Sequence, residues 1–265
     1  MVTLHNAVNY GGLFLGILGA IPVLAAGSKY TSRWRRVRRI LRFQRTGRVD
    51  IVLTTSLARK EKEDGGRVSV VRGLAPEGDI LAMTPSVALL STNFPDKQIV
   101  THLSEKVRGR LDDDLVILGS SASNEYSADF MSRFNLARQL NLTLEVKNGS
   151  IAIDRGAGGN RLKIQDFDVK RNAEGLPKKD IAYIAIGPNP YNANRRAVVC
   201  AGFTTYGTGA ASDVLFNDIL SSRHSRERRL RKVLSNKSAF LIIECHLEFG
   251  NLVHWDELFS QGMQE

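Results

Sequence analysis

Residues 198–215, VVCAGFTTYGTGAASDVL, carry the pattern that decides the fold. The apolar run at 198–201 predicts a buried strand, and 208–221 has the composition of a helix. Between them, residues 202–207 are mostly glycine and threonine. A strand, a short loop and a helix in this order are typical of an α/β sheet. The loop could bind a phosphate, or it could only make a turn.

The same alternation continues on both sides of this stretch. The pattern predicts strands at 49–55, 98–103, 114–119, 142–146, 181–187, 196–202 and 239–246, and helices at 77–94, 125–140 and 208–221. Pro85 predicts a kink or a late start in the first of these helices. We therefore expect an α/β fold with a mainly parallel, Rossmann-like sheet and flanking helices.

Two segments depart from the alternation. Residues 147–180 are polar and rich in glycine, and stretches 151–154 and 162–169 alternate in a way that predicts a β-hairpin insertion. Residues 247–258 follow the last predicted strand and are expected to pair with it as a second hairpin. The expected domain organisation is an anchor at 1–28, a basic segment at 29–48 and an α/β domain at 49–265.

The net charge of +10 comes from two clusters. Residues 29–48 contain nine Lys or Arg and no acid, and residues 223–232 contain six against Glu227 alone. The other 22 Lys and Arg are balanced by 26 Asp and Glu. The basic character therefore predicts local contact with anions, such as phospholipid, a nucleotide or nucleic acid.

The N-terminal segment has no charged residue from Asn6 to Ser28 and is rich in glycine. A signal peptide is disfavoured because no positive region precedes it, and a buried helix stays possible because residues 13–26, the most apolar part, are short. A transmembrane helix fits best. Because the basic flank follows it, we expect a single-pass protein of the cytoplasmic membrane, with the N-terminus outside and the bulk of the chain in the cytoplasm.

The basic segment itself has helical spacing, with Trp34, Val37, Ile40 and Leu41 recurring at intervals of three and four residues. It could lie on anionic lipid, or it could be only a topogenic signal. Lipid is a nearer anion than nucleic acid because the apolar segment adjoins it. The predicted membrane-surface residues are Trp34, Arg35, Arg36, Arg38, Arg39 and Arg42.

Hydroxyl-bearing and glycine residues follow several predicted strands. Ligands of open α/β sheets bind beyond the carboxyl ends of the strands, and helix N-termini there bind phosphate. The same residues also serve as ordinary helix caps. The predicted ligand residues are Thr55, Ser56, Gly119, Ser120, Ser121, Asn124, Gly202, Thr204, Thr205, Gly207 and Thr208.

Catalytic candidates are few. Glu125 lies beside the predicted site and is the one candidate catalytic carboxylate, although a glutamate in a first helical turn also favours the helix dipole. No Cys/His cluster has metal-ligand spacing, so no metal is predicted. Cys200 and Cys245 lie in apolar runs and are expected to be buried thiols.

The stretches DIVLTTS (50–56), DDDLVILGSSASN (112–124) and VVCAGFTTYGTGAA (198–211) resemble Rossmann-like nucleotide-binding domains of bacterial conflict systems, namely the SLOG and nucleoside-deoxyribosyltransferase-like families. The resemblance covers about residues 49–221 and is architectural. It implies a role in bacterial defence and a nucleotide or dinucleotide as ligand. Some of these families cleave N-glycosidic bonds with a glutamate, which here corresponds to Glu125.

Three functions follow as hypotheses. The first is a membrane-anchored sensor that binds a nucleotide-like molecule and changes its assembly, for which a homo-oligomer is a natural partner. The second is an N-glycosidase acting on a nucleoside or NAD. The third is a non-catalytic membrane scaffold.

Overall fold

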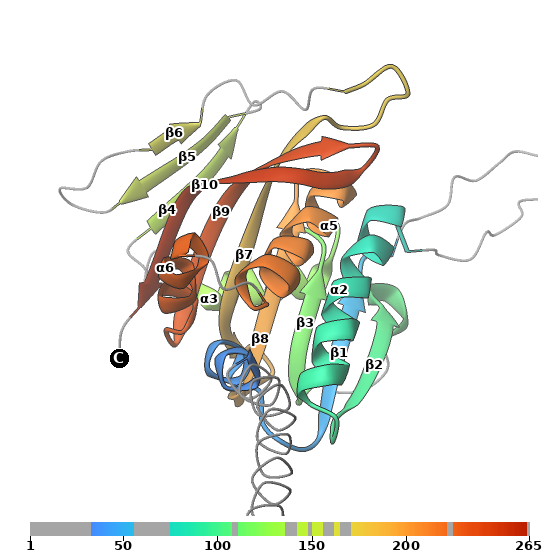
Figure 1. The fold of residues 1–265 in the computed structure, drawn as a ribbon, viewed down its shortest axis with the longest axis vertical. Coiled ribbons are helices and arrows are strands. Elements are labelled where there is room, and N and C mark those ends of the chain that lie inside the picture. Colours follow the sequence, from blue (N-terminus) through green and yellow to red (C-terminus); the bar gives the residue numbers. More distant parts are fainter. Residues whose placement is uncertain are drawn as a thin grey trace, which may run out of the picture.

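A seven-stranded sheet is the centre of the protein (Figure 1). The computed structural model describes residues 33–55, 75–107, 111–135, 142–147, 150–155, 162–164, 171–221 and 225–263. The strand order is β10-β9-β7-β8-β3-β1-β2. The strands are β1 (Arg48–Leu53), β2 (Gln98–Leu103), β3 (Asp114–Leu118), β7 (Lys179–Asn189), β8 (Asn192–Gly202), β9 (Ser238–Glu248) and β10 (Asn251–Met263).

The sheet is mixed, so the prediction of a mainly parallel sheet is wrong. Strands β2, β1, β3 and β8 pair in parallel, whereas β7 pairs antiparallel with β8 and β9, and β10 pairs antiparallel with β9. The cause lies in the connections. Only Pro190 and Tyr191 separate β7 from β8, and a connection this short allows only an antiparallel hairpin. The predicted terminal hairpin is confirmed, with Phe249 and Gly250 at positive φ in its turn.

Helices cover the sheet unequally. One face carries α2 (Glu77–Asn93), α5 (Thr205–Asp213), the π-helical turn η2 (Val214–Ile219), α6 (Ser225–Leu234) and the helical residues 33–41, whereas α3 (Glu125–Phe134) lies on the other face (Figure 1). A 3₁₀ turn, η1 (Ser104–Lys106), follows β2. Helix α2 begins after Pro76 with Glu77 and Asp79 in its first turn, which favours the helix dipole, and it continues through Pro85.

Two apolar cores follow from the alternation of side chains along the strands. Ile184 and Cys200 belong to the core beneath α2, α5 and α6, while Ala185 and Val199 belong to the core beneath α3. The second core is completed by Phe130 and Phe134 of α3, whose rings stack 5.1 Å apart. Both cysteines are buried free thiols, as predicted.

A separate three-stranded sheet contains β4 (Leu142–Lys147), β5 (Ser150–Arg155) and β6 (Leu162–Ile164). The predicted hairpin corresponds to the antiparallel pair β5–β6. Strand β4 pairs with β5 and not with the seven-stranded sheet, because only residues 148–149 separate β4 from β5.

The predicted transmembrane helix and single-pass location need correction. Within the described part of the chain, no helix is long and apolar enough to cross a membrane. The residues on which that prediction rested, 1–28, lie outside the described ranges. The fold class is therefore α/β with a mixed sheet, and the membrane assignment is not retained.

The helical residues 33–41 pack against the protein. Val37, Ile40 and Leu41 are 0–1% exposed and belong to the core beneath the helices. The guanidinium of Arg38 lies 3.9 Å from the centre of the Trp34 ring and 5.4 Å from that of Phe94. The apolar side of this helix is thus buried in the domain, which leaves its exposed arginines as the part that can meet an anion.

Candidate functional site

The carboxyl ends of β1, β3 and β8 meet at one edge of the sheet, so the structure brings most of the predicted ligand residues together. Thr54 and Gly119 are in direct contact there, because a Cβ on Gly119 would lie 2.0 Å from Thr54 Oγ1. Thr55 Oγ1 lies 3.1 Å from Ser104 Oγ at the end of β2, and it accepts a hydrogen bond from Glu105 N. Ser56 lies outside the described residues.

The loop between β8 and α5 holds an anion, and that anion belongs to the protein. Asp180, the second residue of β7, is fully buried. Its Oδ2 accepts hydrogen bonds from Thr204 N at 2.9 Å and Thr204 Oγ1 at 2.6 Å, and its Oδ1 accepts one from Ile181 N at 2.7 Å. Gly207 is close enough that an added Cβ would lie 2.2 Å from Asp180 Oδ2. The position predicted for a phosphate is therefore occupied by a carboxylate.

The remaining residues of this loop have structural roles. Thr204 is the N-cap of α5 and its side chain accepts a hydrogen bond from Gly207 N, while Thr208 Oγ1 accepts one from Gly202 N at 3.2 Å. Burial raises the pKa of Asp180, and the hydrogen bonds from Thr204 oppose that shift. Sequence reasoning missed Asp180; its one visible signal is an acid placed directly before the apolar run of β7.

A second buried carboxylate, Asp79 in the first turn of α2, lies at the same edge. Its Oδ2 accepts a hydrogen bond from Thr54 N at 3.0 Å, whereas its Oδ1 is buried with no hydrogen-bond partner among the described residues. Burial is the main cause that raises the pKa of Asp79 to about 6. Burial therefore makes the ionised form of this carboxyl group less favourable in the folded protein than in the unfolded chain.

Asp79 should make stability depend on pH. Because its pKa is higher in the folded protein than in the unfolded chain, the folded state binds the extra proton, and stability falls as pH rises from about 4 to about 6. Two pKa units correspond to about 3 kcal/mol, which is an upper bound. Asp79→Asn should remove this slope and raise the free energy of unfolding at pH 7.5 by about 1–3 kcal/mol. Urea unfolding at a series of pH values measures it; an unchanged slope in Asp79→Asn would contradict the assignment.

In the loop between β3 and α3, one residue stabilises the fold and two others face a cavity. Asn124 is buried, caps α3 by accepting a hydrogen bond from Tyr126 N, and donates to Leu118 O at 3.0 Å. Its side chain is thus committed to the fold. Ser120 and Ser121, by contrast, face an open cavity.

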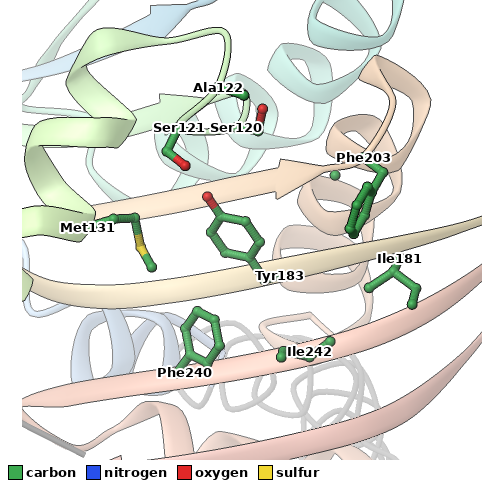
Figure 2. A pocket seen from close by; sticks show the side chains of 10 residues that line it. Ser120, Ser121, Ala122, Met131, Ile181, Tyr183, Phe203, Phe240 and Ile242 are labelled. Carbon is green, nitrogen blue, oxygen red and sulfur yellow. The ribbon is translucent and has the colours of Figure 1, made fainter. Parts of the chain in front are cut away.

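This cavity, which we call the α3-face cavity, has a volume of about 300 Å³ (Figure 2). Strands β7 and β9, α3, and the loops after β3 and β8 all contribute to it. It is lined by Ser120, Ser121, Ala122, Met131, Ile181, Tyr183, Gly202, Phe203, Phe240 and Ile242. Because α3 is the one helix of the described chain on this face of the sheet, part of β7 and β9 is left uncovered by helix, and the cavity lies there.

The lining is apolar with a small polar region. Figure 2 shows the Tyr183 hydroxyl pointing toward Ser121, while the aromatic rings of Tyr183, Phe203 and Phe240 line the rest. Burial raises the pKa of the Tyr183 phenol. Phe203 is 45% exposed, which is unusual for a large aromatic side chain.

Other predicted site residues lie apart from this cavity. Glu125 is exposed in the first turn of α3 and is not among the lining residues. Thr205 begins α5, and the next residue, Tyr206, donates a hydrogen bond to Glu77 at 2.8 Å. Trp34, Arg38 and Arg42 hold residues 33–41 in place, with Arg42 donating to Ser235 O at 2.8 Å. Arg35, Arg36 and Arg39 line a different, strongly basic pocket.

Strands β9 and β10 bring together a group that sequence spacing did not indicate. Glu244, His246 and Asp256 offer ligand atoms within 4.8 Å of one another, which suits a divalent cation such as zinc. Lys179 Nζ already lies 2.8 Å from Glu244 Oε2 and competes with any ion there. The residues come from two strands paired in the structure, so their proximity is invisible in the sequence.

Comparison with models of known protein families gave no match, and comparison with curated protein sequences gave no significant match. The resemblance to nucleotide-binding domains of conflict systems therefore stays a prediction.

Proposed function

We propose that this protein binds a small molecule of about nucleoside size in the α3-face cavity. The observation that carries the proposal is the combination of three aromatic side chains with the hydroxyls of Ser120 and Ser121 in one concave site at the carboxyl edge of the sheet. Aromatic rings can stack on any nucleobase, and hydroxyl groups can form hydrogen bonds with the polar edges of the base.

The volume of the cavity and the absence of charged lining residues limit the class of ligand that can bind. The volume of about 300 Å³ is at the lower end of the range of about 300–1,000 Å³ for ligand pockets, which favours a nucleoside over a dinucleotide. Among the lining residues none is Lys, Arg, Asp, Glu or His. The cavity therefore suits the uncharged part of a nucleotide-like ligand, while phosphates would have to remain outside it.

The N-glycosidase hypothesis is less well supported. Such an enzyme needs a carboxylate beside the sugar, and Glu125 does not line the cavity. Binding without cleavage is therefore the function we propose.

Filling the cavity should abolish binding. We expect adenosine, or another nucleoside in a panel that includes AMP, ADP and NAD, to stabilise the full chain by about 2.7 kcal/mol at 100 times its dissociation constant. Ser121→Phe introduces a ring at an exposed position that faces the cavity and should eliminate this thermal shift.

Ser123→Phe is the matched control, because Ser123 is exposed in the same loop but does not line the cavity. It should leave the shift unchanged. Equal shifts in wild type and Ser121→Phe would place the ligand elsewhere, and no shift with any member of the panel would contradict the proposed ligand class.

A further inference from the structure

Two basic clusters that lie about 190 residues apart in the sequence meet in the folded protein. The helical residues 33–41 and α6 form the walls of a pocket of about 490 Å³, which we call the basic pocket. Six of its lining side chains are cationic: Arg35, Arg36, Arg39, Arg228, Arg231 and Lys232. Its other lining residues are Ile40 and Ser235, so no carboxylate takes part.

The fold itself fixes these cations. Val37 and Ile40 of one wall and Leu230 and Leu234 of the other are 0–1% exposed in the core. Hydrogen bonds tie the walls to the domain: Arg33 donates to Ser221 Oγ at 3.0 Å, and Arg231 donates to Ile219 O at 3.0 Å. The positive charges are therefore held together by packing and do not belong to a loose arm.

Holding like charges together costs free energy unless something compensates. Within the described residues, the side chains of Arg35, Arg39, Arg228 and Lys232 make no hydrogen bond or ion pair with the protein. Glu227 is the acidic residue of α6 and is 9% exposed. Its negative charge raises the pKa of Arg231, whereas burial, the larger cause, lowers the pKa of Arg231. Four of the six cations of the pocket therefore present their positive charge to solvent without a partner among the described residues.

We propose that the basic pocket binds a compact anion that carries two or more phosphate groups. Five of the six cations are arginine, whose planar guanidinium pairs with phosphate oxygens through two hydrogen bonds. A concave pocket between two helices suits a compact polyphosphate, whereas an extended nucleic acid needs a long basic stripe. A free polyphosphate and a phosphorylated lipid headgroup share this chemistry.

Calorimetric titration of the full chain with inorganic tripolyphosphate tests the proposal. We expect saturable binding that weakens as salt rises from 50 to 300 mM, since the contacts are ionic. The triple variant Arg35→Gln, Arg39→Gln, Arg228→Gln should bind at least about 100-fold more weakly, because each lost charge-assisted contact is among the stronger kinds. Loss of repulsion should also keep its unfolding temperature at or above that of wild type, which separates lost binding from lost folding.

The matched control is Lys106→Gln, Lys178→Gln, Lys237→Gln, which removes three charges from exposed lysines that do not line the pocket. It should change the affinity less than about threefold. An equal loss of affinity for tripolyphosphate in both triple variants would show that only net charge matters, and this would contradict binding in the pocket. The absence of binding to wild type would also contradict the proposal.

Two further arms identify the source of the phosphates. If a lipid headgroup is the ligand, vesicles of phosphatidylcholine with 5% phosphatidylinositol bisphosphate should retain the protein, and tripolyphosphate should release it. If the protein binds tripolyphosphate but not these vesicles, the ligand is a free molecule. A 20-nucleotide single strand should bind to wild type and to the pocket triple variant with the same affinity, because we expect it to contact the protein outside the pocket. A strand that needs the pocket and that saturating tripolyphosphate does not displace would contradict a compact ligand.

Discussion

Asp180→Ala should lower the free energy of unfolding by about 3–5 kcal/mol. Three groups donate hydrogen bonds to the fully buried Asp180 side chain: Thr204 N, Thr204 Oγ1 and Ile181 N. The substitution leaves all three donors without this acceptor. Each buried donor left without a partner costs about 1–3 kcal/mol. Denaturant unfolding at pH 7 measures the loss, and Asp96→Ala, at an exposed aspartate, should change stability by less than about 0.5 kcal/mol.

The same variant tests whether the loop is an anion site filled by the protein. With the carboxylate gone, added acetate or phosphate should bind to the vacated donors at the start of α5 and raise the unfolding temperature of Asp180→Ala more than that of wild type. Equal effects of acetate on both proteins, or a stability loss below 1 kcal/mol, would show that Asp180 does not hold this loop.

Gly202→Ala should be as damaging, for a purely steric reason. A Cβ on Gly202 would lie 2.4 Å from the carbonyl carbon of Gly207 and 2.6 Å from Thr208 N, and backbone atoms cannot yield as a flexible side chain can. We expect a loss of at least about 3 kcal/mol or failure to fold. Thermal unfolding or soluble yield provides the readout.

Gly209→Ala is the comparison for this variant. Gly209 lies in α5, the helix that Gly202 approaches, and its added Cβ would meet Gly78 O at 3.2 Å, a much milder contact. Alanine also suits a helix interior better than glycine by about 1 kcal/mol. We expect little net change. If Gly202→Ala were as stable as Gly209→Ala, the close approach of β8 to α5 would be wrong.

The sequence predicted the alternation of strands and helices well, because each element carries its own periodicity. It could not predict the direction of β7. That direction depends on the turn at Pro190 and Tyr191, where the chain turns back and β8 pairs antiparallel with β7 as a hairpin. Ser120 and Ser121 could be found from their place after a buried strand. The aromatic lining could not, since Tyr183 and Phe240 lie on strands that become neighbours only in the sheet.

Two other features show the same limit. An anion position after β8 was predictable from small and hydroxylated residues at a helix start, but its occupant, Asp180, comes from 24 residues earlier in the chain. Each basic cluster was visible separately, and the first one indicated lipid contact. Its burial through Val37 and Leu41, and its pairing with α6, depend on packing that composition alone does not reveal.

We expect a ligand to bind in the α3-face cavity and not at the Thr204–Thr208 loop, where Asp180 already accepts hydrogen bonds from Thr204 N and Thr204 Oγ1. The most direct measurement is a map of backbone amide chemical shifts in the full chain during titration with adenosine or the best nucleoside of the panel. We expect saturable shifts at Ser121, Tyr183 and Phe203, and small ones from Thr204 to Thr208. Saturable shifts concentrated at Thr204 and Gly207, with Tyr183 unaffected, would contradict it.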